Sequence, residues 1–340
     1  MQIPGRTIFG LGAGVVLIAT LAVLSVAYGS TFIAPGEVIR SLAASLGLGG
    51  SDTPLPIQRI VVDLRLPRAV LAIAVGAGLG VIGAMLQTVT RNDLADPFLF
   101  GLSSGAAAGA VSVITVLGDR FGVWTLPLAA FSGGMLAAII VLLLTRRVHG
   151  QGPERLILAG LAVSFIFAAL TNYLVFAGDQ RAAHSILFWT LGGLGLARWD
   201  NLPLALVGFA AIMIFALLFH RRLDAFLAGE STAESLGIET HRMRSTVFIV
   251  CAFSTAIFVS SAGVIGFVGL MIPHVARMLA GPLHAGLVLT CAILGALLVL
   301  LSDLAARLIL APQELPIGIV TSSIGAFFVV WLLLRSKASS

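Results

Sequence analysis

Apolar runs separated by short polar segments dominate this sequence, and most of them are long enough to cross a bilayer as a helix, which takes about 20 residues. Two weaker runs, 99–117 and 263–280, are interrupted by glycine and other small residues, which neighbouring helices can bury. The pattern therefore predicts an all-α, polytopic membrane protein with ten transmembrane helices. The eight continuous runs lie at about 7–28, 69–88, 127–145, 155–177, 202–219, 245–262, 286–310 and 316–334.

The composition agrees with this pattern and excludes a water-soluble globular protein. Of the 340 residues, 59% are hydrophobic and 10% are charged, and the mean hydropathy is +1.08. Ten spans would use roughly 200 residues, which leaves too few for an added soluble domain. We therefore expect residues 1–340 to form a single transmembrane domain, with the first apolar run retained as a span.

An even number of spans places both termini on one side of the membrane. With the termini in the cytoplasm, the short cytoplasmic loops carry more arginine than the short external loops, as the positive-inside rule expects. On this topology segment 220–244 is cytoplasmic, and the longer segments 29–68 and 178–201 lie outside. The basic residues are dispersed, so the net charge of +5 does not indicate a nucleic-acid partner.

The cytoplasmic segment 220–244 is expected to contain two short helical turns, at 223–227 and 233–236, on either side of Gly229. Gly237 ends the second turn. The apolar face of these turns needs a cover, which could be a cytoplasmic partner protein or the lipid headgroups. The side chains on this face are Leu223, Phe226, Leu227 and Leu236.

Three arginines stand near the outer ends of predicted spans. Arg65 and Arg68 open the second span, and Arg307 follows Asp303 by one turn in the ninth. Guanidinium groups suit the carboxylates of an anionic partner, but they also reach phosphate headgroups. For Arg307, a local ion pair with Asp303 is a further interpretation.

A polar segment at the inner end of the second span predicts a hinge. It begins at Gln87 and includes Asn92, Asp96 and Pro97. The glycines that follow, at 101, 105 and 109, are spaced one turn apart, which permits close contact with another helix.

Groups that could carry catalysis or ion coupling are few. No carboxylate lies at the centre of a predicted span, which argues against an ion-coupled secondary transporter. The only lysine, Lys337, is outside any Walker A loop, so the chain is not expected to hydrolyse ATP. The histidines are scattered, which argues against a membrane-embedded enzyme. Cys251 and Cys291 are expected to be packing residues, and we expect no metal or cofactor in this chain.

The ordered segments resemble the FecCD-type permeases, the membrane subunits of type II ABC importers for iron-siderophore complexes, haem and cobalamin. The resemblance covers nearly the whole chain. Departures occur at Asp93, where the family usually has Pro, and in the segments 281–285 and 325–327. The matching segments are Arg65-Leu66-Pro67-Arg68, Asn92 with Leu94-Ala95-Asp96-Pro97, Leu156-Ile157-Leu158-Ala159-Gly160, Trp189 with Gly192, Gly229-Glu230 with Leu236-Gly237, Gly266-Phe267-Val268-Gly269-Leu270 with Pro273-His274 and Arg277, Asp303 with Arg307, and Glu314-Leu315-Pro316-Ile317-Gly318.

The resemblance implies a multi-pass permease of the bacterial cytoplasmic (inner) membrane with a fold like that of the cobalamin-importer permease. Its partners would be a second permease subunit, most simply an identical one, two cytoplasmic ATP-binding subunits that hold ATP and Mg, and an external or periplasmic substrate-binding protein. Transport would follow alternating access. A ferric siderophore is the first expectation for the cargo, with haem and cobalamin as alternatives.

The resemblance also implies roles for particular residues. Coupling to the ATPase is implied for Asp224, Phe226, Leu227, Gly229, Glu230, Ala233, Leu236 and Gly237. Docking of the binding protein is implied for Arg65, Arg68 and Arg307. A gate or hinge is implied for Gln87, Asn92, Asp96, Pro97, Gly152 and Pro153.

Overall fold

A computed structural model describes residues 5–29, 31–48, 53–118, 122–147, 154–178 and 183–336. Within these ranges every regular element is helical. Eight helical segments are long and apolar enough to cross a membrane, and each contains one long helix. These helices are α1 (Gly5–Ala27), α4 (Leu66–Thr90), α6 (Thr125–Arg147), α7 (Glu154–Ala177), α9 (Leu202–Leu227), α11 (Thr240–Ala262), α13 (His284–Leu308) and α14 (Ile317–Ser336).

The remaining elements are shorter. Two of them are apolar and lie in the two weaker predicted spans: α5 (Leu102–Ser112), which continues as the π-helical η3 (Val113–Leu117), and α12 (Val268–Ala280). The others are α2 (Pro35–Ser45), α3 (Leu55–Arg59), the π-helical η1 (Ile60–Arg65), the 3-10 helices η2 (Pro97–Phe100) and η4 (Gly122–Trp124), α8 (Ala183–Thr190) and α10 (Glu230–Ser235).

The predicted class, an all-helical membrane protein, is confirmed, and each of the eight continuous apolar runs corresponds to one long helix. The count of ten full spans is not matched, because the two weaker runs form helices shorter than a span. In the second of them, residues 263–267 are not helical, since Gly263 and Phe267 both adopt positive φ angles of 65° and 66°. This irregular backbone is tolerated because it is covered by protein, including Gly192 and the start of α14.

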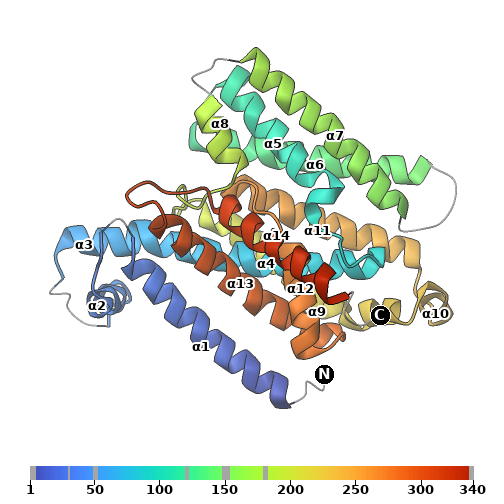
Figure 1. Cartoon of the computed structure of the whole chain (residues 1–340), viewed down its shortest axis with the longest axis horizontal. Helices are drawn as coiled ribbons and strands as arrows, with labels where there is room; N and C mark the ends of the chain where they lie inside the picture. Colours follow the sequence, from blue (N-terminus) through green and yellow to red (C-terminus); the bar gives the residue numbers. More distant parts are fainter. Residues whose placement is uncertain are drawn as a thin grey trace.

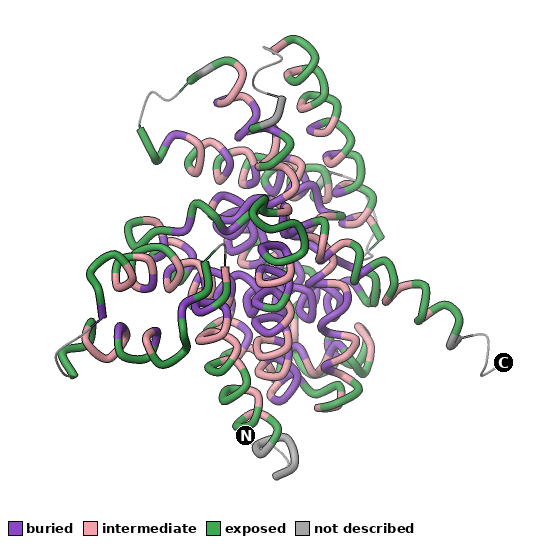
Figure 2. The backbone as a smooth tube through the Cα atoms, turned by 60° about the vertical axis from the view of Figure 1, so that its left-hand side comes forward, coloured by how far each residue is buried: buried purple, intermediate pink, exposed green. Residues whose placement is uncertain are grey.

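α4 is the central helix of the bundle (Figure 1), and the buried backbone gathers at the centre of the molecule (Figure 2). In its most apolar stretch 89% of residues are buried, against 17% for α1, so α4 is surrounded by protein while α1 is largely open to lipid. Glycines allow the close packing: Gly76 meets the backbone of Gly295 on α13, and Gly83 meets the backbone of Gly269 on α12.

Helices α5, α6 and α7 form a group on one side of the central helices (Figure 1). Gly105 and Gly109 of α5 lie against the backbone of Gly133 and Ala129 on α6. The predicted role of these glycines in close helix packing is therefore confirmed.

The bundle has two ends, which we name after short helices. The α10 end comprises residues 91–96, 228–239 and 281–283, and the α2 end comprises residues 31–48, 53–59, 191–201 and 309–316. In Figure 1, α1 begins and α14 ends toward the α10 end. This arrangement agrees with the prediction that both termini lie on one side of the membrane.

Candidate coupling site and hinge

The segment predicted to couple to an ATPase lies at the α10 end, but its helices differ from the prediction. Residues 223–227 are not a separate turn; they are the last turn of α9, because no helix breaker precedes Gly229, which has a φ of 106°. α10 begins at Glu230, and Gly237, with a φ of 80°, ends it as expected. We call residues 224–239 the coupling segment.

The apolar face of this segment divides into a buried and an exposed part. Leu223 and Phe226 are 0% and 2% exposed, so the chain itself covers them, and the prediction that they need an external cover is wrong. Leu227 and Leu236 are 46% and 67% exposed. Of the four apolar side chains on this face, these two leucines are therefore the ones that can contact a partner protein or lipid.

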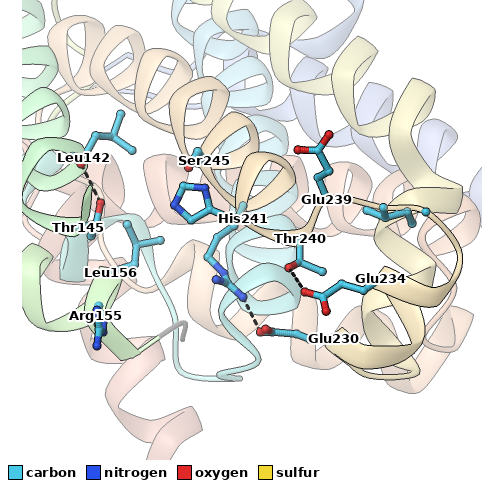
Figure 3. A pocket seen from close by; sticks show the side chains of 13 residues that line it. Leu142, Thr145, Arg155, Leu156, Glu230, Glu234, Glu239, Thr240, His241 and Ser245 are labelled. Carbon is cyan, nitrogen blue, oxygen red and sulfur yellow. Dashed lines mark hydrogen bonds and ion pairs between the residues drawn. The ribbon is translucent and has the colours of Figure 1, made fainter. Parts of the chain in front are cut away.

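Polar contacts fix α10 to the start of α11 (Figure 3). Thr240 Oγ1 donates to Glu234 Oε1 at 2.8 Å, and Arg244 Nη2 donates to Glu230 Oε1. The Nε atom of Arg244 donates to the Val89 carbonyl of α4 at 3.1 Å. Arg244 is only 9% exposed, and it joins α11 to both α4 and α10. This buried cation was not predicted from the sequence.

A second contact ties the end of α9 to the start of α13. Asp224 Oδ1 accepts the backbone N–H of His284 at 2.7 Å and lies 2.7 Å from Nδ1 of the same residue. His284 is the first residue of α13, whose own N-cap residue, Leu283, makes no side-chain cap. Asp224 therefore caps α13 from another helix. The other ring nitrogen, Nε2, lies 2.8 Å from Thr88 Oγ1 on α4.

A polar cavity of about 470 Å³ opens beside these contacts, between α6, α7, α10 and α11. In Figure 3, Thr145 and Arg155 line one wall, and Glu230, Glu234 and His241 lie across the cavity. Its wall carries side chains of both signs of charge beside apolar ones.

The predicted hinge is held at both ends. Gln87 Nε2 lies 3.2 Å from the carbonyl oxygens of both Gly269 and Leu270 on α12. Asn92 Oδ1 accepts the N–H of Leu94 at 2.9 Å, which forms a local turn. Asp93, which replaces the usual Pro, lies 3.4 Å from Arg277 of α12. The departure from the family pattern therefore adds an ion pair to this hinge.

Asp96 is the buried acid of the hinge. Its Oδ1 accepts the N–H of Phe98 at 2.9 Å and caps η2, with Pro97 at the first helical position. Its Oδ2 has no hydrogen bond of ordinary geometry among the described residues, and it lies beside Gly269 in the first turn of α12. Burial raises the pKa of Asp96 to about 6, and the backbone N–H groups of Phe98 and Leu270 oppose that shift. The other predicted gate residues, Gly152 and Pro153, lie outside the described residues.

The three arginines predicted for docking lie at the α2 end and are bonded within the chain. Arg68 Nε is 2.8 Å from Asp303 Oδ1, and Arg307 Nε is 3.0 Å from Asp303 Oδ2. Arg65 donates to the carbonyl oxygens of Val26 and Ala27. The local Asp303–Arg307 pair is confirmed, while docking stays a prediction that would require these side chains to change partners.

The same cluster includes a second acid, Glu314, and a contact between Asp303 and Arg68, neither of which was predicted from the sequence. Asp303 is 0% exposed although it lies near the end of α13, and Glu314 Oε2 is 2.8 Å from Arg68 Nη1. An apolar cavity of about 890 Å³ adjoins them, with Trp124, Phe188 and Trp189 in its wall. Its volume lies in the range of small-molecule sites, and its lining suits an organic surface.

Comparison with known proteins assigns the family. A family model described as the FecCD transport family matches residues 16–335. The chain belongs to the FecCD transport family. This FecCD permease is 36% identical over 339 residues to an ABC transporter permease protein of Methanocaldococcus jannaschii, with 95% of this chain and 94% of that protein covered. It is 34% identical over 321 residues to the vitamin B12 import system permease protein BtuC of Salmonella typhi, with 94% and 93% covered.

Solved structures agree with this assignment. A metal-chelate type ABC transporter in an inward-facing conformation matches the FecCD permease with a TM-score of 0.83 at 30% identity, over 96% of this chain and 98% of that chain. PsaBC from Streptococcus pneumoniae matches in fold with a TM-score of 0.53 at 16% identity, over 77% and 88% of the two chains. The protein is therefore a multi-pass membrane permease of the type II ABC importer class.

Proposed function

We propose that this FecCD permease carries an iron chelate, with a ferric siderophore as its first cargo, into the cell at the expense of ATP. The observation that supports this most is the match over 96% of the chain to a transporter described as metal-chelate type. Cobalamin is the second candidate, because BtuC is 34% identical over 94% of the chain. Haem is the third.

Energy would come from two cytoplasmic ATP-binding subunits with ATP and Mg. The exposed Leu227 and Leu236 offer them an apolar contact on the coupling segment, next to the exposed Glu234. The other coupling residues hold this surface in place through contacts within the chain. Asp224 caps α13, Glu230 binds Arg244, and Phe226 and Ala233 are buried, while Gly229 and Gly237 set the ends of α10.

Cargo would cross between this chain and a second permease subunit, most simply an identical one, in a bacterial cytoplasmic membrane. A binding protein would deliver it to the α2 end. Of the three arginines proposed to dock that protein, Arg68 and Arg307 have side chains only 14% and 5% exposed. Arg65 binds main-chain carbonyls and has no carboxylate partner among the described residues, so it is the first of the three to test.

The deciding experiment is uptake into proteoliposomes that hold this permease with its cognate ATPase and binding protein. Labelled ferric siderophore, haem and cobalamin are offered in parallel, with and without ATP, and with an ionophore as control. We expect uptake of the ferric siderophore that requires ATP and resists the ionophore. Uptake of haem or cobalamin alone would replace the cargo, and uptake that follows an ion gradient without ATP would overturn the proposed energy source.

Docking is tested in the same vesicles by Arg65→Glu. If Arg65 meets an acidic side chain of the binding protein, this change weakens capture most strongly at low salt. Arg40→Glu, an exposed arginine of α2, is the matched control for a general change in charge at this end. Unchanged capture at low salt would remove Arg65 from the docking surface.

A further inference from the structure

Three consecutive residues at the end of α4 each bind a different helix. Gln87 binds the carbonyl oxygens of Gly269 and Leu270 on α12, Thr88 binds His284 on α13, and the Val89 carbonyl accepts from Arg244 on α11. All three are at most 6% exposed. We call residues 87–89 the α4 node. The node is the helical part of the predicted hinge: α4 ends at Thr90, and the chain turns at Arg91 into the rest of the hinge, which contains Asp96.

Two of these contacts continue to the coupling segment. Arg244 binds Val89 through Nε and Glu230, the first residue of α10, through Nη2. His284 faces Thr88 with Nε2 and Asp224, in the last turn of α9, with Nδ1. The coupling segment is thus tied to adjacent residues of α4 on both sides of the α9–α10 break at Gly229.

Because these contacts are buried, breaking them is energetically unfavourable. Arg244 and His284 are 9% and 0% exposed, so their polar groups have little water to exchange with if a bond breaks. A guanidinium that binds with two different nitrogen atoms also fixes the angle between its partners, which a single contact does not. Sliding the coupling segment relative to α4 would therefore leave buried donors and acceptors unpaired.

We propose that Arg244 and His284 are positioning residues that make the coupling segment and the α4 node move as one rigid unit. A displacement of α10 would then reach the hinge through α4 and would not be taken up in the loop around Gly229. This inference rests on the proposed function, because it requires an ATPase that displaces α10.

The first test measures the rigid unit directly in the assembled importer. Spin labels are placed at Ser231 of α10 and at Arg91, both exposed, so that the leucines proposed to contact the ATPase stay unaltered, while Cys251 and Cys291 are fully buried and stay unlabelled. We expect the 231–91 distance to be the same with and without ATP, while the distance from 231 to a label at Leu46, at the α2 end, changes. A 231–91 distance that shifts with ATP as much as the 231–46 distance does would overturn the proposal.

The second test removes one of the two contacts between the coupling segment and the α4 node, the one made by Arg244. Arg244→Gln should allow the 231–91 distance to change with ATP and should lower uptake per ATP hydrolysed by roughly 5-fold or more, the size of a typical coupling between sites. Arg242→Gln is the matched control, because Arg242 lies on the same turn and pairs with Glu239 at the surface, with side chains 77% and 65% exposed. We expect it to change neither quantity.

The outcomes distinguish the positioning role of Arg244 from the proposed importer function. Normal uptake per ATP in Arg244→Gln, with an unchanged 231–91 distance, would overturn the positioning role and leave the importer function intact. Absence of ATP-dependent uptake in the unaltered complex would instead overturn the proposed function. If Arg244→Gln does not assemble, the label distances in the chain that keeps Arg244 still decide the question. A fall in melting temperature alone would not count as support, because any buried arginine can have that effect.

Discussion

The Nε atom of Arg68 lies 2.8 Å from Oδ1 of Asp303, and the other carboxylate oxygen of Asp303 is 3.0 Å from Nε of Arg307. One buried carboxylate therefore pairs with two arginines on different helices. Its removal leaves two poorly hydrated cations beside each other, and breaking a buried ion pair in this way costs about 3–5 kcal/mol.

We therefore expect Asp303→Asn to lower the melting temperature of the purified permease substantially. Glu314→Gln is the control, because Glu314 binds the same Arg68 but is 48% exposed, and exposed pairs contribute about 0–1 kcal/mol. Thermal unfolding in detergent compares the two. Equal losses for both variants would show that Asp303 is not the centre of the cluster.

The packing of α4 on α12 predicts that Gly83→Ala lowers the stability of the permease. A Cβ at this position would collide with the carbonyl group of Gly269, which is backbone and cannot rotate away. Overpacking of this kind costs about 1–3 kcal/mol. Gly12→Ala on α1 is the control, since nothing lies within 4 Å of its added carbon. We expect a lower melting temperature for the first variant only; a neutral Gly83→Ala would mean that the two helices separate easily.

Asp96 predicts a pH dependence of stability. Its pKa is raised from 3.8 to about 6 when folded, so both states are protonated below pH 4, and the contribution of Asp96 to stability is most favourable there. Between pH 4 and 6 only the unfolded state has released its proton, so stability falls as pH rises. The loss is complete above about pH 6 and amounts to about 3 kcal/mol at most.

Asp96→Asn tests this, because the amide stays neutral and can still cap η2. We expect its melting temperature to exceed that of the unaltered chain by a margin that grows from pH 4 to pH 6 and is then constant. Asp93→Asn, at a position whose side chain is 76% exposed, should show little change. A margin for Asp96→Asn that is independent of pH would contradict the assignment.

The exposure of Leu236 on the coupling segment predicts that a charged substitution there weakens ATPase binding. Leu236→Asp puts a charge on an apolar contact, and a central contact residue is worth about 1–2 kcal/mol or more, so we expect ATPase affinity to fall by at least about tenfold. Leu46→Asp makes the same change at the α2 end, where Leu46 is 74% exposed. Titration of the ATPase against permease in nanodiscs measures both. Similar losses at the two ends would mean a general effect of charge on the bundle.

The apolar pattern located the helices because span length and hydropathy are local properties. It was least accurate where a run contains helix-disrupting positions, as at Gly263 and Phe267, and where a helix continues past the apolar run, as α9 does to Leu227. The polar pattern and the family resemblance together predicted the coupling segment and the hinge, and their roles stay predictions. Contacts such as Arg244 with Val89, or His284 with Asp224 and Thr88, were not predictable, because residues distant in sequence leave no local pattern when they bond.

The enclosure of α4 by protein has a consequence for synthesis. The helix is complete at Thr90, whereas α9 begins at Leu202 and α11, α12 and α13 follow later still. Until those helices are made, the glycines of α4 that pack on α12 and α13 and the side chains of Gln87 and Thr88 lack their native partners. The native surroundings of the central helix are therefore assembled last, and a chain that stops before α13 is inserted without its core.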